Sequence, residues 1–258
     1  MRLLRGAHCG EVVVCPDPEE LGQRAAERFV QLVGEAVDRK GVCAVALAGG
    51  STPKMLYRNL ASEPFLTGVA WPVLHLFWGD ERFVPPDHPA SNYRMVKETL
   101  LSSVSLPSAN IHRVPTERGE PEFVAAAYEQ EIRQFFGLLR NEMPRFDVVL
   151  LGMGEDGHTA SLFPETPVLE ESKLLVAATY VQQLASYRVT LTFPVLNHAS
   201  NVIFLVSGKA KAGVLRDVLR GECRPEKLPA QRVQPCGGTL VWMVDRAAAS
   251  RLLDHSLP

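Results

Sequence analysis

The sequence predicts an α/β fold in which a largely parallel sheet is covered by helices on both faces. Two observations support this class. Predicted strands alternate with predicted helices through most of the chain, and the strand segments are apolar without strict alternation, as in strands buried on both faces. The length of 258 residues suits one α/β domain or two smaller ones, and no linker forces a division. We therefore expect a single domain over residues 1–258.

The first half of the chain shows both kinds of element clearly. Residues 19–40 follow a turn at Pro16-Asp17-Pro18 and carry apolar side chains every three or four positions, which predicts a helix with one buried face. Further helices are predicted over 54–60, 92–101 and 121–140. Strands are predicted over 11–15, 42–48 and 73–78, with a short one around 110–114.

The second half continues the alternation. Strands are predicted over 146–151, 174–179, 188–192, 201–206 and 240–244. A helix is predicted over 209–220, and 194–199 reads as a short helix or a turn. Asp245 is expected to cap a final helix that runs through Leu253.

Composition excludes several classes of protein. A net charge of −2 gives no general attraction to nucleic acid, so a bound anion must meet a local cluster of cations. The five cysteines form no Cys-x-x-Cys pair, which argues against a disulfide framework and a zinc site and favours a reducing cytoplasm. No stretch approaches the roughly 18 to 20 apolar residues of a membrane span. We expect a cytoplasmic protein without membrane or nucleic-acid partners, either a monomer or a small homo-oligomer.

Polar motifs follow four of the predicted strands, at residues 49–53, 79–82, 152–158 and 207–211. In open α/β sheets, ligands bind in the crevice at the carboxyl ends of the strands. The four strand ends are therefore expected to line one crevice.

The first motif, Gly49-Gly50-Ser51-Thr52-Pro53, offers a place for an anion. Hydroxyls precede a predicted helix whose first position suits Pro53, so free backbone N–H groups and the positive end of the helix dipole lie at Ser51 and Thr52. This predicts a phosphate cradle. The alternative is a helix start that binds nothing, because the motif lacks the lysine of a phosphate loop.

Five motifs in order resemble the 6-phosphogluconolactonase family, within the glucosamine-6-phosphate isomerase/6-phosphogluconolactonase superfamily. They are AGGSTP at 48–53, WGDERFVP at 78–85, LGMGEDGHTASLFP at 151–164, RVTLT at 188–192 and SGKAK at 207–211. The resemblance runs from about residue 11 to residue 253. It implies a Rossmann-like sheet and hydrolysis of 6-phospho-D-glucono-1,5-lactone to 6-phosphogluconate in the oxidative pentose phosphate pathway, without a metal or another cofactor.

The resemblance assigns candidate catalytic residues. Lactone hydrolysis needs a base for water, and the neutral ring of His158 can accept a proton near pH 7. Asp156 is placed to orient that ring, although it also suits the turn before Gly157. Arg82 offers a fixed cation for the phosphate or for the developing oxyanion.

The remaining candidates are expected to hold the substrate. Gly50, Ser51 and Thr52 form the expected phosphate cradle, and Arg188 and Lys211 would add positive charge to the phosphate unless they are ordinary surface cations. Asp80 is placed to pair with Arg82. Its neighbour Glu81 reads as a side chain that points to solvent, and all three could form a solvated turn.

Two other functions are compatible with parts of the sequence. A glucosamine-6-phosphate isomerase/deaminase shares the Gly-Ser-Thr-Pro and Asp-Gly-His motifs, but that family typically continues into Ile-Ala-Phe-Asn-Glu-Pro. Here the continuation is Thr159-Ala160-Ser161-Leu162-Phe163-Pro164, without the glutamate, which argues against the deaminase. A non-catalytic sugar-phosphate sensor would normally add a DNA-binding helix-turn-helix, for which no residues are left over. A stand-alone sensor is the remaining alternative, and it requires both Asp156 and His158 to be incidental.

Overall fold

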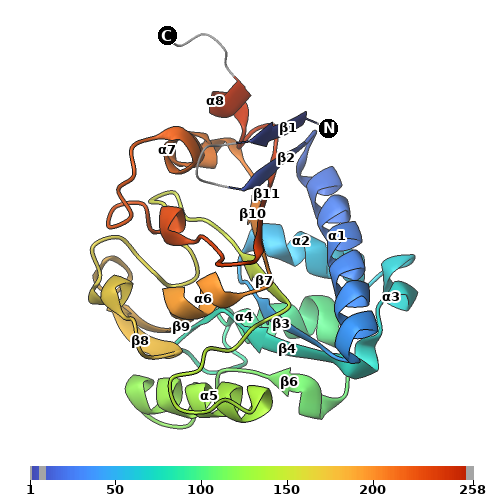
Figure 1. Cartoon of the computed structure of the whole chain (residues 1–258), viewed down its shortest axis with the longest axis vertical. Helices are drawn as coiled ribbons and strands as arrows, with labels where there is room; N and C mark the ends of the chain where they lie inside the picture. The colour runs from blue at the N-terminus through green and yellow to red at the C-terminus, as the bar shows by residue number, and fades with distance from the viewer. Residues whose placement is uncertain (1, 6–9, 254–258) are drawn as a thin grey trace.

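A computed structural model describes residues 2–5 and 10–253. Its main sheet has eight strands (Figure 1). Their spatial order is β1 (Arg2–Arg5), β2 (Glu11–Cys15), β11 (Thr239–Asp245), β10 (Asn201–Val206), β7 (Val148–Leu151), β3 (Cys43–Leu47), β4 (Leu74–Trp78) and β6 (Ile111–His112). Only β1 pairs with its neighbour in the antiparallel sense, so the predicted largely parallel sheet is confirmed.

Helices lie on both sides of this sheet. Figure 1 shows α1 and α2 on one side and α6 and α7 on the other. The helices are α1 (Pro18–Lys40), α2 (Ser51–Leu60), α3 (Phe65–Gly68), α4 (Asn92–Val96), α5 (Pro121–Phe136), α6 (Phe193–His198), α7 (Ala212–Arg220) and α8 (Ser250–Leu253). A π-helical turn, Lys97–Leu101, continues α4, and a 3-10 turn, Lys209–Lys211, precedes α7, so the predicted helices over 92–101 and 209–220 are confirmed.

The long helix α1 shows how local signals fix an element. The Asp17 side chain accepts a hydrogen bond of 2.9 Å from the Glu20 backbone N–H, and Pro18 occupies the first turn, where no N–H is needed. The helix ends at Gly41, whose φ of 74° lies in the left-handed region that favours glycine. Between these ends, the predicted apolar face is buried against the sheet.

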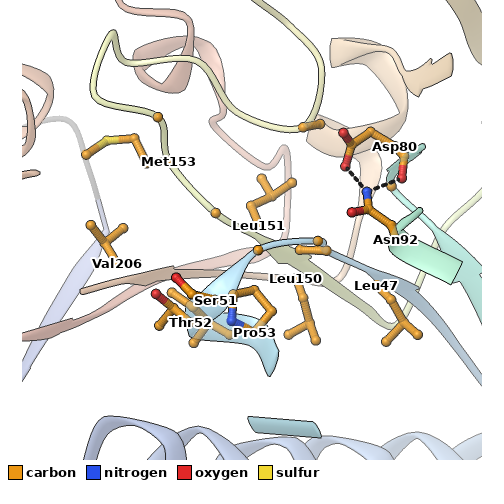
Figure 2. Close-up of a pocket in the computed structure, with 18 of the residues that line it drawn as sticks. Leu47, Ser51, Thr52, Pro53, Asp80, Asn92, Leu150, Leu151, Met153 and Val206 are labelled. Atoms are coloured by element: carbon orange, nitrogen blue, oxygen red, sulfur yellow. Dashed lines mark hydrogen bonds between the residues drawn. The ribbon is translucent and has the colours of Figure 1, made fainter. Parts of the chain in front are cut away.

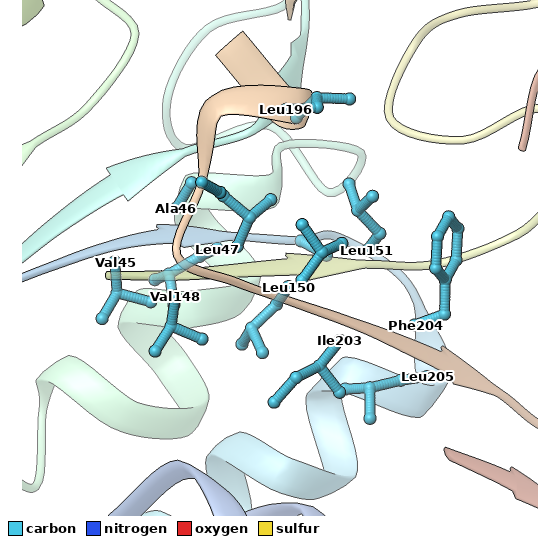
Figure 3. Packing of buried hydrophobic residues seen from close by; sticks show 14 of the residues in the cluster. Val45, Ala46, Leu47, Val148, Leu150, Leu151, Leu196, Ile203, Phe204 and Leu205 are labelled. Carbon is cyan, nitrogen blue, oxygen red and sulfur yellow. The ribbon is translucent and has the colours of Figure 1, made fainter. Parts of the chain in front are cut away.

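The core centres on β3, β7 and β10. Figure 3 shows side chains of these three neighbouring strands, among them Val45, Val148, Leu150 and Ile203, packed together. Each of the four is at most 2% exposed, and burying one aliphatic side chain of this size contributes about 1.5–3 kcal/mol. This packing fixes the middle of the sheet and therefore the position of the loops at its carboxyl edge.

A second, smaller sheet was not predicted. It consists of β5 (Asp80–Arg82), β9 (Ser186–Leu191) and β8 (Val176–Val181), all antiparallel. The motif at 79–82 was expected to be a loop, but three of its residues pair with β9 and place Arg82 opposite Arg188. The second sheet therefore brings two distant arginines together beside the main sheet.

Three smaller differences have local causes. Helix α5 stops at Phe136 rather than residue 140, because Gly137 adopts a φ of 62°, and Leu139 is left 71% exposed. Strand β1 and helix α3 were not predicted. Asp245 accepts the Ala248 N–H as a cap would, but α8 begins only at Ser250, and the same carboxylate also accepts the Ser207 hydroxyl and the Gly208 N–H.

Candidate functional site

A crevice opens at the carboxyl edge of the main sheet, where all four predicted strand ends meet. It has two adjoining lobes. The inner lobe lies over β3, β7 and β10 and includes the start of α2, and the outer lobe extends toward the second sheet. Six residues line both lobes, namely Asp80, Arg82, Gly154, His158, Ala160 and Lys211. The predicted convergence of the four motifs is confirmed.

The inner lobe contains the predicted phosphate cradle. Gly50 precedes α2 with a φ of 103°, a conformation that favours glycine, and Ser51 and Thr52 form the first turn (Figure 2). Neither hydroxyl has a hydrogen-bond partner within the described residues. These hydroxyls and the free amides of the helix start can therefore bind an anion.

His158 lies where the two lobes join, on the loop after β7. Its Nδ1 is 2.5 Å from Oδ1 of Asp156, and the same oxygen accepts the His158 backbone N–H at 3.1 Å. An ionised carboxylate can only accept, so Nδ1 carries the proton in the neutral ring and Nε2 keeps its lone pair. The ring stacks on Phe163 with centroids 4.0 Å apart. A Cβ at Gly154 would overlap the ring, which explains why glycine occupies that position.

The side chain of Asp156 is 48% exposed. Partial burial alone would raise its pKa, but the hydrogen bond and the charge of His158 outweigh that effect, so the pKa is lowered overall. Asp156 therefore stays ionised and holds the His158 ring while also bracing its backbone. Both roles considered from the sequence, orienting the ring and stabilising the turn, are compatible with this geometry.

Arg82 and Arg188 face each other across β5 and β9. Arg82 donates through Nη1 to the Ala90 carbonyl at 2.8 Å, and Arg188 donates to the Ser186 hydroxyl and the Tyr187 carbonyl. Burial, and next the charge of Arg82, lower the pKa of Arg188. No carboxylate within the described part of the chain is ion-paired with either guanidinium, so both retain donors for an anionic ligand.

The expected pair between Asp80 and Arg82 does not form. The Asp80 carboxylate instead accepts the Ser161 hydroxyl at 2.7 Å and lies 3.5 Å from Nδ2 of Asn92, which also donates to the Asp80 carbonyl (Figure 2). These contacts hold the Asp80 side chain at the crevice. The expectation that Glu81 points to solvent is also wrong, because its side chain is buried.

Lys211 is the last residue of the 3-10 turn between β10 and α7, and it lines both lobes. Its Nζ lies 3.9 Å from the exposed carboxylate of Glu155, near the limit of an ion pair. An exposed pair of this kind contributes little, so the ammonium can turn to a ligand. With Lys211 placed, all nine predicted site residues lie at one crevice, although Arg188 and Asp156 line only the outer lobe and Gly50, Ser51 and Thr52 only the inner one.

Two residues of this site were missed. Asn92 lines the inner lobe and lies so close to Gly49 that a Cβ there would overlap its amide, while Ser161 binds Asp80. Ser161 lies in the segment 159–164, which supports the family resemblance and the distinction from the deaminase but does not by itself indicate a role for Ser161. Among the described residues, no cluster of three His, Cys, Asp or Glu side chains could hold a metal ion, and no helix is long and apolar enough to cross a membrane.

Comparison with known proteins places this geometry in a family. Residues 16–242 match the family described as glucosamine-6-phosphate isomerases/6-phosphogluconolactonase. The chain belongs to this family. The family description covers two activities, an isomerase and a lactonase, so membership alone does not choose between them.

Similar proteins from this family carry the name of the lactonase. The chain is 40% identical to 6-phosphogluconolactonase of Synechocystis sp. over 94% of its own length and 98% of the relative's. It is 41% identical to the 6-phosphogluconolactonase of Nostoc sp., over 93% and 98% of the two chains. The solved structure of 6-phosphogluconolactonase from Trypanosoma cruzi superposes with a TM-score of 0.83 at 31% identity, covering 94% of this chain and 96% of the other.

Proposed function

We propose that this chain, folded as a single cytoplasmic domain, hydrolyses 6-phospho-D-glucono-1,5-lactone to 6-phosphogluconate in the oxidative pentose phosphate pathway. The observation that carries the proposal is the His158–Asp156 pair at the junction of a crevice lined by Arg82, Arg188 and Lys211, of which only Lys211 has a carboxylate within ion-pair distance among the described residues. A histidine base suits attack by water, and the cations suit a substrate that bears a phosphate and develops an oxyanion.

In the proposed mechanism, Nε2 of His158 takes a proton from water as the water oxygen bonds to the lactone carbonyl carbon. The negative charge of Asp156 stabilises the imidazolium that forms. When the bond from that carbon to the ring oxygen breaks, the imidazolium returns its proton to the departing alkoxide. The products are a carboxylic acid, ionised at neutral pH, and a free sugar hydroxyl.

The two lobes suggest how the substrate lies. The phosphate fits the inner lobe, where the α2 start offers amides and the hydroxyls of Ser51 and Thr52, with Lys211 close by. The lactone carbonyl then lies near His158, with Arg82 shared by both lobes and Arg188 on the outer side. In this arrangement Arg188 serves the reacting end of the substrate rather than the phosphate.

One position argues against the deaminase in structural terms. When the continuation after His158 is set beside Ile-Ala-Phe-Asn-Glu-Pro, Phe163 stands where that motif has its glutamate. Phe163 stacks flat on the His158 ring and offers no group that could transfer a proton. The proposed base His158 is therefore present, whereas the glutamate that the deaminase motif carries for ring opening of an amino sugar is absent from this position.

The function is tested with lactone made freshly by glucose-6-phosphate dehydrogenase, because the lactone also hydrolyses spontaneously. We expect the wild-type protein to remove the lactone faster than a protein-free blank. A rate equal to the blank would exclude the lactonase. A parallel assay for ammonia from glucosamine 6-phosphate should stay at background, and ammonia release would instead support the deaminase.

A further inference from the structure

Glu81 lies between two residues of the crevice but does not itself enter it. Asp80 and Arg82 line the crevice from β5, whereas the Glu81 side chain leaves the opposite face of that strand, as alternation requires. Its side chain is buried, and Glu81 as a whole is only 2% exposed. Within the described residues, no Lys, Arg or His is ion-paired with it.

Four donors satisfy this buried carboxylate. Oε1 accepts the backbone N–H groups of Arg82 at 2.8 Å and Asn92 at 2.7 Å. Oε2 accepts the Tyr93 N–H at 2.7 Å and the Ser91 hydroxyl at 3.2 Å. One oxygen thus bridges the backbones of Arg82 and Asn92, two crevice residues ten positions apart in the sequence.

The bridge closes the loop between β5 and α4. The ends of residues 83–91 meet at the Glu81 carboxylate, and the Arg82 guanidinium crosses the loop to the Ala90 carbonyl. Asn92 in turn donates to the Asp80 carbonyl. If the carboxylate were lost, the backbone that carries Arg82 and the start of α4 would no longer be tied together.

Capping of α4 explains only part of the contacts of this carboxylate, because the Asn92 and Tyr93 N–H groups belong to the first turn of α4 but the Arg82 N–H does not. Ser91 already caps this helix, because its hydroxyl accepts the Arg94 N–H at 3.1 Å. Burial raises the pKa of Glu81 to about 7, although its three backbone hydrogen bonds oppose the shift. A carboxylate without a cation partner is costly to bury, so its presence beside the crevice calls for a role that a helix cap alone does not fill.

We propose that Glu81 is a positioning residue, which holds the Arg82 guanidinium and the Asn92 amide at the crevice by binding both backbones through one carboxylate oxygen. The inference rests on the proposed lactonase function for its kinetic consequence. Its structural content, the placement of Arg82 by Glu81, does not depend on the substrate.

The kinetic test is a double-mutant cycle of Glu81→Gln and Arg82→Ala on the fresh lactone. The glutamine amide has one acceptor atom where the carboxylate has two, so one pair of donors loses its acceptor. We expect Glu81→Gln to lower kcat/KM roughly 10- to 100-fold, since a misplacement of about 1 Å can cost that much. On the Arg82→Ala background the same change should cost less than about threefold, because the side chain being positioned is gone. Equal losses on both backgrounds would overturn the proposal.

A second measurement does not require turnover. The NMR signal of the Arg82 Nε–Hε group, identified by its loss in Arg82→Ala, should shift and broaden in Glu81→Gln. The backbone amides of Arg82, Asn92 and Tyr93 should also exchange with solvent faster. An unchanged Arg82 signal would overturn the positioning role even if activity fell. A wild-type protein without lactonase activity would refute the proposed function and leave this measurement as the test of Glu81.

Two further variants serve as a control for specificity and as a substitute if Glu81→Gln does not fold. Glu98→Gln removes a carboxylate bonded to Arg94 on the same helical segment, without touching Arg82, and should leave the kinetics and the Arg82 signal unchanged. If Glu81→Gln does not fold, Glu81→Asp keeps the charge but draws the carboxylate back by one methylene group. It should show the same pattern as Glu81→Gln, and wild-type kinetics with a wild-type Arg82 signal would overturn the proposal.

Discussion

The two edges of the main sheet differ in whether their charged side chains form ion pairs. At the amino edge, Asp147 is buried before β7, where its carboxylate accepts the Ala44 N–H at 2.8 Å and pairs with Arg39 and Lys40 at 3.1 and 2.9 Å. At the carboxyl edge, Arg82 and Arg188 face each other without a carboxylate ion-paired to either within the described residues.

We expect the amino edge to contribute to the stability of the fold and the carboxyl edge to contribute to ligand binding. A buried acid whose oxygens are all satisfied ties α1, β3 and β7 together, and breaking such a cluster destabilises a fold. Two close guanidiniums repel each other, and the sheet holds them together where an anion can neutralise both. Substitutions at the amino edge should therefore change unfolding, and substitutions at the carboxyl edge should change turnover.

The largest effect is expected from His158→Ala, which removes the proposed base. Loss of a general base typically costs 10²- to 10⁴-fold, and we expect kcat to fall about 10³-fold with little change in the melting temperature. The measurement is the fresh-lactone assay together with thermal unfolding. The control is His198→Ala, whose ring contacts the Pro144 carbonyl outside the crevice and whose loss should leave turnover per folded molecule unchanged. Full activity in His158→Ala would refute the base assignment.

Asp147→Ala should have the next largest effect, on stability instead of activity. The change leaves the buried Ala44 N–H without its acceptor and removes two ion pairs, so we expect the free energy of unfolding to fall by about 3 kcal/mol. Denaturant unfolding measures this, and kcat/KM should not change. As a matched control, Glu27→Ala breaks an exposed pair with Arg24 and should cost less than about 1 kcal/mol. Lost turnover in a fully folded Asp147→Ala would contradict the separation of the two edges.

Arg188→Ala removes one of the facing cations. We expect kcat/KM to fall about 10- to 30-fold, in the range of a lost charged hydrogen bond, and the melting temperature to hold or rise because Arg82 loses a like-charged neighbour. Arg94→Ala, whose guanidinium is paired with Glu98, serves as the control and should not affect turnover. A clear drop in the melting temperature with unchanged kinetics would show that Arg188 is a structural residue.

The smallest effect is expected from Asp156→Asn, because asparagine can still accept from Nδ1 of His158 but lacks the charge. We expect kcat to fall about tenfold. Folding lowers the pKa of Asp156 below its ordinary value of about 4. The ionised carboxylate therefore stabilises the fold above about pH 4, and this stabilisation is lost as the pH falls through the lower pKa of the folded state. The stability difference between wild type and Asp156→Asn should therefore vanish in acid. A difference that grows below pH 4 would contradict this sign.

Most of the main sheet could be predicted, because its strands are buried on both faces and read as continuous apolar runs. Strand β3, for instance, is buried at every position, and the glycines after it mark its end. The second sheet could not be predicted from the same signals. Its strand β5 is only Asp80-Glu81-Arg82, and three charged residues become a strand there only because β9 supplies the partner.

The candidate site was likewise predictable in part. Motifs after strands indicated where Ser51, Arg82, His158 and Lys211 would meet, since parallel strands end at one edge. The partners of Asp80 and Glu81 depend on Ser161 and on the start of α4, which only the folded chain brings near. The charged triplet suggested solvent exposure, whereas three of the four donors that permit burial of Glu81, from Ser91, Asn92 and Tyr93, lie ten to twelve residues away.

The crevice also sets a condition on biosynthesis. Its walls come from residues 47–53, from β5 and from the loop after β7, and they are complete only when Lys211 follows β10. Residues 47–53 and β5 are synthesised early. The binding surface, however, is complete only after about four-fifths of the chain has been made and β10 has paired with β7. A nascent or truncated chain that ends before β10 lacks a central strand of the core as well as Lys211, so it has no assembled pocket in which to capture a sugar phosphate.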